Sequence, residues 1–278
     1  MSPSSKSRGP SIEALDDLLL GLYGALVPES RRLDHAVRYF STWSGSDKLM
    51  MVTQYGVKLL APLLQRRAEL QFAAGLRPKP VSPSTEGLYA FARTLSAARR
   101  VSGFWGILSI LKALSGLERS RPDSRVQLNL QRLQGVCMLV FYPLEYISFF
   151  STPSLAPILP ITPQQSLRAS LWSVRAWGVY VLLQIALLVR ELMEIVHKLA
   201  TGAVDAEGEH GRLAAMKRRR AIIYQLVANV SRLPVILHWS LVKGFYKNEL
   251  WTNGLSFISA VASIRGGWEA NRLPSPKR

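Results

Sequence analysis

The chain is poor in cysteine, in charged residues and in alternating apolar–polar runs. Its 278 residues include one cysteine, Cys137, which excludes an intramolecular disulfide and a cysteine-based metal cluster. Charged residues make up 19%, below the ~25% usual for soluble domains. No stretch of convincing length alternates with the period of two that a half-buried strand requires. The sequence therefore predicts an all-α fold.

The charge that is present is strongly basic. Lysine and arginine number 35 against 18 acidic residues, a net charge of +17, and 48% of the residues are hydrophobic. So high an apolar content excludes an intrinsically disordered chain. A basic and apolar chain suits either an anionic membrane surface or nucleic acid. We expect no nucleic-acid partner, because the basic residues are dispersed among apolar segments and no binding module is recognisable.

The first half of the chain reads as a disordered tail, residues 1–11, followed by an N-terminal helical region, residues 12–132. Apolar residues at three- and four-residue spacing predict helices from Ile12 to Glu69, with Ser30 capping the second helix and Ser44 or Ser46 opening the third. The proline-rich stretch Gly75–Ser84 predicts a loop. Another helix is expected from about Pro83 to Leu114, and Gly116–Ser124 should end it.

The second half contains the apolar segments, and residues 133–268 are expected to form a membrane-embedded helical region before a C-terminal tail, residues 269–278. A membrane span needs ~20 mainly apolar residues. Four segments approach that length, and each is either a span or a buried helix of a soluble bundle: Leu133–Phe150, Ala169–Val189, Ala221–Val242 and Leu250–Gly267.

The fourth segment carries small residues on one helical face, and small residues let helices approach closely in lipid. These candidate membrane-helix packing residues, which ordinary core packing would explain equally well, are Ser256, Ala260, Ser263 and Gly267. The connection 197–220 is expected to be a loop, and it ends in the basic run 217–220. The positive-inside tendency places that loop in the cytosol, and an even number of crossings would leave both termini cytosolic.

The stretch Pro83–Leu108 has the composition of a helix that lies in the membrane interface, with an apolar stripe, a basic rim and moderate hydrophobicity. Arg93 and Arg100 fall opposite the stripe, whereas Arg99 falls near it, where its stem could snorkel to lipid phosphates. An amphipathic core helix is the competing interpretation. At ~100° per residue the stripe consists of Leu88, Phe91, Leu95, Ala98 and Trp105.

Signals of catalysis are weak. The four histidines show no metal-ligand spacing, and the nucleophile-elbow, P-loop and GxGxxG patterns do not occur. We therefore expect no enzyme activity, no catalytic residue, no metal and no cofactor. Ionisable residues inside apolar segments, namely Glu145, Arg175 and Arg232, leave a channel or transporter as an alternative, because such residues commonly mark a solute path.

Three passages in order resemble the peroxin-11 family of peroxisomal membrane proteins. Residues 47–49 and 54–60 read DKL and QYGVKLL, similar to the N-terminal family helix. Residues 95–100, LSAARR, resemble the family segment assigned to the membrane-remodelling amphipathic helix. Residues 253–268 resemble its last hydrophobic segment, so the resemblance spans roughly 33–268. The proline-rich inserts Gly75–Ser84 and Ser151–Pro163, and Gly103, depart from the pattern.

The resemblance implies a peroxisomal membrane protein that bends and elongates the membrane before fission, and so promotes peroxisome proliferation. It implies self-association, a dynamin-related GTPase with its membrane adaptors, and insertion by the peroxisomal membrane-protein import receptor. The basic charge of the chain adds an anionic phospholipid membrane as the expected partner. Solute passage has also been proposed for relatives. The amphipathic-helix role carries over to the matching residues Leu88, Phe91, Arg93, Leu95, Arg99 and Arg100.

Overall fold

The structure is a computed structural model that describes residues 11–26, 30–120, 124–152, 155, 158–203 and 208–271. These residues form helices joined by short connections and contain no strand, which confirms the all-α prediction. Most of the expected tails, namely residues 1–10 and 272–278, and part of the 151–163 insert lie outside the described residues, whereas the first positions of the expected C-terminal tail belong to the last helix. The helices are α1 (Ile12–Leu26), α2 (Arg31–Phe40), α3 (Trp43–Ala73), α4 (Pro83–Gly103), α5 (Gly106–Arg119), α6 (Arg125–Phe150), α7 (Pro163–Ala200), α8 (Gly208–Ser240) and α9 (Glu249–Ala270).

Several helices begin where a polar side chain satisfies a free backbone N–H of the first turn. Ser30 stands at the N-cap of α2, as expected, although its side chain makes no capping hydrogen bond there. The cap of α3 is Thr42, whose Oγ1 accepts from the Gly45 N–H at 3.0 Å, so the helix opens before the two serines that were predicted to start it. At α7, Thr162 and Gln165 form a reciprocal capping box.

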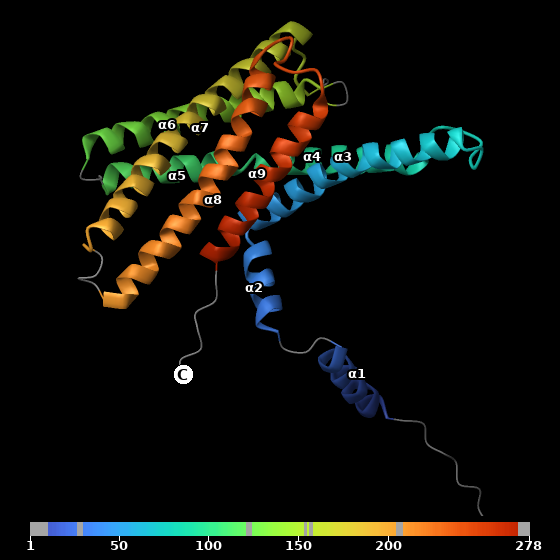
Figure 1. Ribbon diagram of the computed structural model, residues 1–278, viewed down its shortest axis with the longest axis horizontal. Coiled ribbons are helices and arrows are strands. Elements are labelled where there is room, and N and C mark those ends of the chain that lie inside the picture. The colour runs from blue at the N-terminus through green and yellow to red at the C-terminus, as the bar shows by residue number, and fades with distance from the viewer. Residues whose placement is uncertain are drawn as a thin grey trace, which may run out of the picture.

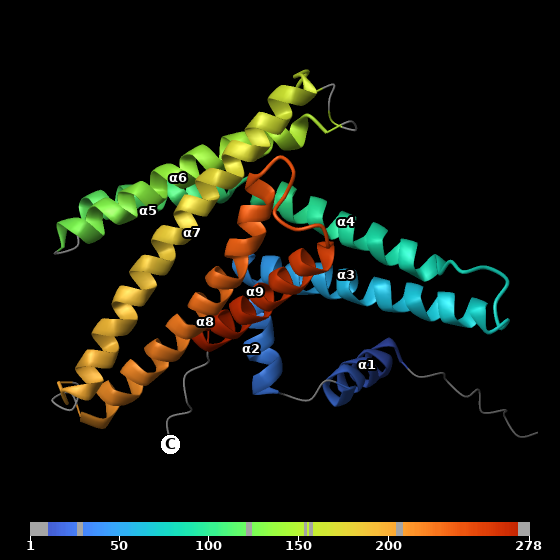
Figure 2. The same cartoon turned by 45° about the horizontal axis from the view of Figure 1, so that its top comes forward.

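The long helices pack as a chain of neighbours that closes on itself. α3 and α4 form an antiparallel arm that projects to one side, whereas α6, α7 and α8 follow one another on the other side (Figures 1 and 2). α9 then returns beside α8 and packs on α3. The joint between the first and last long helices is a small apolar core of Met51, Tyr55 and Ala260.

α2 is held to the end of α9 by aromatic rings. The rings of His35 and Trp268 lie 4.0 Å apart, and Nε2 of His35 is 2.9 Å from the Trp268 carbonyl oxygen. The Tyr39 ring lies against Gly267, where an added Cβ would collide with it. α1, by contrast, stands apart from the rest in both views (Figures 1 and 2).

The helix expected over Pro83–Leu114 is interrupted in the structure. α4 ends at Gly103 and α5 begins at Gly106. Tyrosines of α6 account for the break: the Tyr142 ring occupies the space that a side chain at Gly106 would need, and the Tyr146 hydroxyl donates to the Arg100 carbonyl at 2.8 Å. That carbonyl would otherwise accept the next turn of the helix.

The loop expected over residues 197–220 is also wrong, because α7 runs to Ala200 and α8 begins at Gly208. The basic run 217–220 is therefore helical. Arginine, lysine, alanine and methionine all favour helix, and they make up most of residues 212–220. The charge of this stretch reflects an exposed helix surface rather than a flexible connection.

Two of the described helices, α6 and α8, are long and apolar enough to cross a membrane. In each, only 22% of the apolar window is buried inside the chain. The core helix of a soluble bundle would be mostly buried, so this exposure favours contact with lipid. The segments expected in α7 and α9 do not meet the same criterion.

Candidate membrane-binding site

One face of α4 is occupied by contacts with α3. Three residues spaced seven apart, Thr85, Ala92 and Arg99, lie on this face. The Thr85 hydroxyl donates to the Ala61 carbonyl at 3.3 Å, and Ala92 is fully buried. The seven-residue spacing keeps the contact on one side of the helix over its whole length. The opposite face of α4 is consequently free to contact something else.

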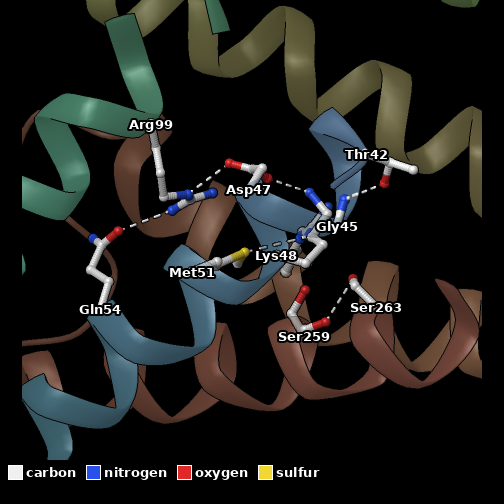
Figure 3. Close-up of polar contacts among 10 residues, drawn as sticks. Thr42, Gly45, Asp47, Lys48, Met51, Gln54, Arg99, Ser259 and Ser263 are labelled. Carbon is white, nitrogen blue, oxygen red and sulfur yellow. Dashed lines mark hydrogen bonds and ion pairs between the residues drawn. The ribbon is translucent and has the colours of Figure 1, made fainter. Parts of the chain in front are cut away.

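Arg99 belongs to the face that packs on α3. Its Nε donates to Oδ1 of Asp47 at 2.8 Å and its Nη1 donates to Oε1 of Gln54 at 3.0 Å (Figure 3). Its side chain is 20% exposed. The structure thus places the guanidinium in an internal network, away from the lipid phosphates to which the sequence analysis assigned it.

The carboxylate of Asp47 is the centre of this network. Burial alone would raise the pKa of the Asp47 carboxyl. Attraction from Lys48 and Arg99, with a hydrogen bond from each, outweighs burial and holds that pKa below its ordinary value. Asp47, Gln54 and Arg99 all come from the motifs that carry the family resemblance, and the structure brings them into contact.

The free face of α4 carries the apolar stripe. Phe91, Ala98 and Trp105 follow one another at seven-residue spacing and are exposed, Trp105 to 67%. Leu88 and Leu95 of the predicted stripe are half-buried at the edge toward α3. A large aromatic left this exposed at the end of a continuous apolar stripe marks an interaction surface.

The exposed stripe is longer than the sequence analysis expected. Val101 lies on the same face, and Phe104, Leu108 and Leu111 extend it across the break onto α5. From Ala98 onward these residues follow one another at steps of three or four positions, and that spacing was the available signal. We call the exposed residues Phe91, Ala98, Val101, Phe104, Trp105, Leu108 and Leu111 the outer stripe.

Basic side chains border the outer stripe. Arg93 and Arg100 are exposed on the far flank of α4, with the small residues Ala90 and Ala97 between them and the stripe. The Arg100 guanidinium also lies over the Phe149 ring of α6 at 5.2 Å. An apolar strip with cations on one flank is the arrangement that an anionic bilayer surface favours.

The small residues predicted to pack membrane helices lie at contacts within the chain. Ser256 and Ala260 are buried, and Ala260 contacts Met51 and Tyr55 of α3. Gly267 lies against Tyr39 of α2, while the Ser263 hydroxyl donates to the Ser259 carbonyl of its own helix. Ala260 and Gly267 therefore let α9 approach α3 and α2, and helix packing in lipid stays a prediction for all four residues.

A polar cavity of about 260 Å³ lies between α6, α7 and α8. Glutamines from all three helices line it, among them Gln134 and Gln184, which are joined by a 2.8 Å hydrogen bond. A bidentate pair between Arg218 and Glu191 forms part of the wall. Among the residues that the structure describes, no group of histidine, cysteine and carboxylate side chains could hold a metal ion.

The all-helical chain has two helices that are long and apolar enough to cross a membrane and a basic, apolar outer stripe, which together fit a membrane-associated protein. The family model for peroxisomal biogenesis factor 11, PEX11, matches residues 33–268, and the chain therefore belongs to that family. Its members are peroxisomal membrane factors of biogenesis and proliferation and are not known as enzymes. Comparison with curated proteins and with solved structures finds no match.

Proposed function

We propose that this protein remodels and elongates the peroxisomal membrane through the outer stripe, and so promotes peroxisome proliferation and fission. The observation that carries the proposal is the division of α4 into two faces, one fixed to α3 and the other apolar, exposed and bordered by Arg93 and Arg100. Membership of the PEX11 family supports the organelle and the process.

The mechanism follows from the depth at which such a helix inserts. An interfacial helix buries its apolar face ~5–10 Å into one leaflet. The 21 residues of α4 extend about 31 Å along the surface at about 1.5 Å per residue. Area added to one leaflet only bends the membrane toward that side. Because α4 is already held by α3, insertion does not require the helix to leave its own fold.

The remaining elements of the proposal rest on the family. They are self-association, contact with a dynamin-related GTPase and its membrane adaptors, and delivery by the peroxisomal membrane-protein import receptor. An anionic phospholipid surface and both termini in the cytosol are proposed from the charge pattern instead. The basic flank of α4 and the exposed basic run 217–220 on α8 are consistent with a cytosolic surface.

Insertion of the outer stripe can be measured directly, since the chain has a single cysteine. In a Cys137→Ser background, an environment-sensitive fluorophore is attached at Ala98→Cys on the outer stripe. In a second variant it is attached at Glu86→Cys, an exposed position on the flank of α4 that carries Arg93. In proteoliposomes of phosphatidylcholine with phosphatidylserine, the probe at position 98 should report an apolar environment and the probe at position 86 should report water. Equal exposure of both probes to water would contradict the proposal.

The same surface can be tested in cells. Trp105→Glu in the full chain should abolish the elongation of peroxisomes seen beside a matrix marker, because a carboxylate on the outer stripe opposes insertion. Leu18→Glu makes a comparable change on α1, where the leucine is 69% exposed, and should leave elongation unchanged. Both tagged chains should still form rings around the marker. Normal elongation by the Trp105 variant would refute the role of the stripe.

Passage of solutes is a second candidate, and the polar cavity between α6, α7 and α8 is the observation that favours it. Two of these helices are the candidate spans. Single-channel recording in planar bilayers tests it: Gln134→Leu, which removes a buried amide of the cavity, should change the conductance. A bilayer containing the protein that shows no conductance would remove this candidate.

A further inference from the structure

The second arginine near the internal network, Arg232, has no carboxylate of its own. It lies in α8 and faces the start of α3, where its Nη2 is 3.9 Å from Sδ of Met51. Its Nε atom is buried and has no hydrogen-bond partner among the described residues. A buried guanidinium N–H without an acceptor costs more than an ordinary unmade hydrogen bond, because the group is charged.

The nearest carboxylate is already used by two other cations. Lys48 Nζ lies 2.6 Å from one oxygen of Asp47, and Arg99 Nε lies 2.8 Å from the other oxygen (Figure 3). Glu145 of α6 lies near Arg99 and Arg100, and no electrostatic contact joins it to Arg232 in the described part of the chain. Lys48, Arg99 and Arg232 therefore share Asp47, which leaves a charge of about +2 between α3, α4 and α8.

The excess charge affects its neighbours. Burial lowers the pKa of the Lys48 ammonium, Asp47 opposes that effect, and the positive charge of Arg232 lowers the pKa further. The cluster is still accessible, since the side chains of Asp47, Lys48 and Arg99 remain 17%, 24% and 20% exposed. The tyrosines Tyr55 and Tyr180 are close enough to Arg232 to interact with it electrostatically.

We propose that Arg232 and Lys48 form a binding site for a phosphate group. A tetrahedral phosphate offers several acceptor oxygens and one or two negative charges, which match the unpaired guanidinium of Arg232 and the ammonium of Lys48, whose one carboxylate partner also serves Arg99. The phosphate comes either from a lipid headgroup or from a free phosphate ion. The site lies between α3 and α8 and uses none of the outer stripe, so it stands independently of the membrane remodelling proposed above.

The test compares Arg232→Met with Arg219→Gln, an exposed arginine of the same helix that gives the same loss of charge. Thermal unfolding of the full chain is followed in non-ionic detergent micelles, with inorganic phosphate or with chloride at equal ionic strength. Phosphate should raise the Tm of the unsubstituted chain and of Arg219→Gln. Arg232→Met should weaken the apparent phosphate affinity by about tenfold or more, the effect of losing a charged hydrogen-bond partner.

The sign of the effect without phosphate separates binding from a purely structural role. Arg232→Met removes an unpaired buried cation, so it should raise Tm in chloride and reduce the phosphate increment to little more than the general stabilising effect of the salt. If Arg232 only supported the fold, its loss would lower Tm in both buffers and leave the increment intact. The general stabilising effect of phosphate on folded proteins persists in the variant, so the Tm increment of the variant can be subtracted from that of the unsubstituted chain.

A lipid source is distinguished in nanodiscs of phosphatidylcholine with or without phosphatidic acid. Stabilisation by phosphatidic acid alone identifies a headgroup site, and stabilisation by inorganic phosphate as well identifies a site open to the free ion. No Arg232-dependent stabilisation by either probe would overturn the proposal. Should Arg232→Met fail to fold, Lys48→Met carries the comparison of the phosphate increments, because Lys48 supplies the second donor, while its Tm in chloride is expected to fall with the loss of the pair to Asp47.

Discussion

Replacement of Arg99 distinguishes an internal anchor from a lipid contact. In Arg99→Met the Asp47 carboxylate keeps Lys48 but loses the guanidinium, and Gln54 loses its 3.0 Å donor. Removing one partner of a fully buried pair costs about 3–5 kcal/mol, and an exposed pair is worth about 0–1 kcal/mol. With the two side chains 17% and 20% exposed, we expect a loss of about 2 kcal/mol.

The assay is denaturant unfolding of the full chain in detergent micelles, followed by tryptophan fluorescence. A double-mutant cycle with Asp47→Asn should give a coupling of about 1–2 kcal/mol, since the two groups are in direct contact. Arg99→Lys should restore only part of the loss, because an ammonium does not reproduce the two directed hydrogen bonds of the guanidinium.

The pH dependence provides an independent check. The pKa of Asp47 is depressed in the folded chain, so its contribution to stability is present above the ordinary value of ~3.9 and is lost as the pH falls through the lower folded pKa. Arg99→Met should reduce the depression and flatten the acid side of the stability profile below about pH 4.

Lipid binding separates the roles of the three arginines. Arg93→Gln and Arg100→Gln should each weaken the response to anionic vesicles about fivefold, since a basic residue near such a surface contributes ~1 kcal/mol. Arg99→Met should leave that response nearly unchanged in protein that is still folded. The reasoning is refuted if Arg99→Met weakens vesicle binding as strongly as Arg93→Gln while the unfolding midpoint stays the same.

Two further changes test the packing that supports the site. Gly267→Ala should destabilise the chain by about 1–3 kcal/mol, because the new Cβ collides with the Tyr39 ring. In the same helix, the new Cβ of Gly254→Ala meets nothing within 4 Å, so that variant should be neutral or stabilising by up to about 1 kcal/mol. Similar denaturation midpoints for the two variants would contradict the clash. Thr162→Ala removes the capping box with Gln165 and should cost about 1 kcal/mol, measured as a lower midpoint, while Thr162→Ser should retain most of the stability.

The amphipathic character of α4 was predictable because it depends on residues a few positions apart. The spacing of Phe91, Ala98 and Trp105 on one side and of Arg93 and Arg100 on the other follows from the geometry of a single helix. The structure leaves all five exposed. Most helix positions could be predicted for the same local reason, since caps such as Ser30 and breaks such as Gly75–Ser84 act on their immediate neighbours.

The break between α4 and α5 shows where local reasoning stops. Gly103 and Gly106 make an interruption possible, but a long helix could also tolerate them. The interruption depends on Tyr142 and Tyr146, which are about 40 residues away along the chain and are placed there by the packing of α5 on α6. No window of sequence around the break contains that information.

Arg99 illustrates the same limit within the site. On the isolated helix it lies beside the apolar stripe, a position equally suited to lipid phosphate and to a partner helix. The direction of the Arg99 side chain is set by its hydrogen bonds to Asp47 and Gln54, which lie on the neighbouring face of α3. The unpaired charge of Arg232 likewise exists only because α8 and α3 meet, 181 residues apart at the contact with Met51.

The sequence by itself determined the helical class, the basic and apolar character, the family motifs and the apolar spacing of Phe91, Ala98 and Trp105. These are properties of residues within a few turns of one another, or of the whole composition. The tertiary structure decided which arginines face outward, where α4 ends and which buried cations lack a counter-charge. Those outcomes depend on long-range contacts, because a side chain's partner is set by whichever helix packs against it.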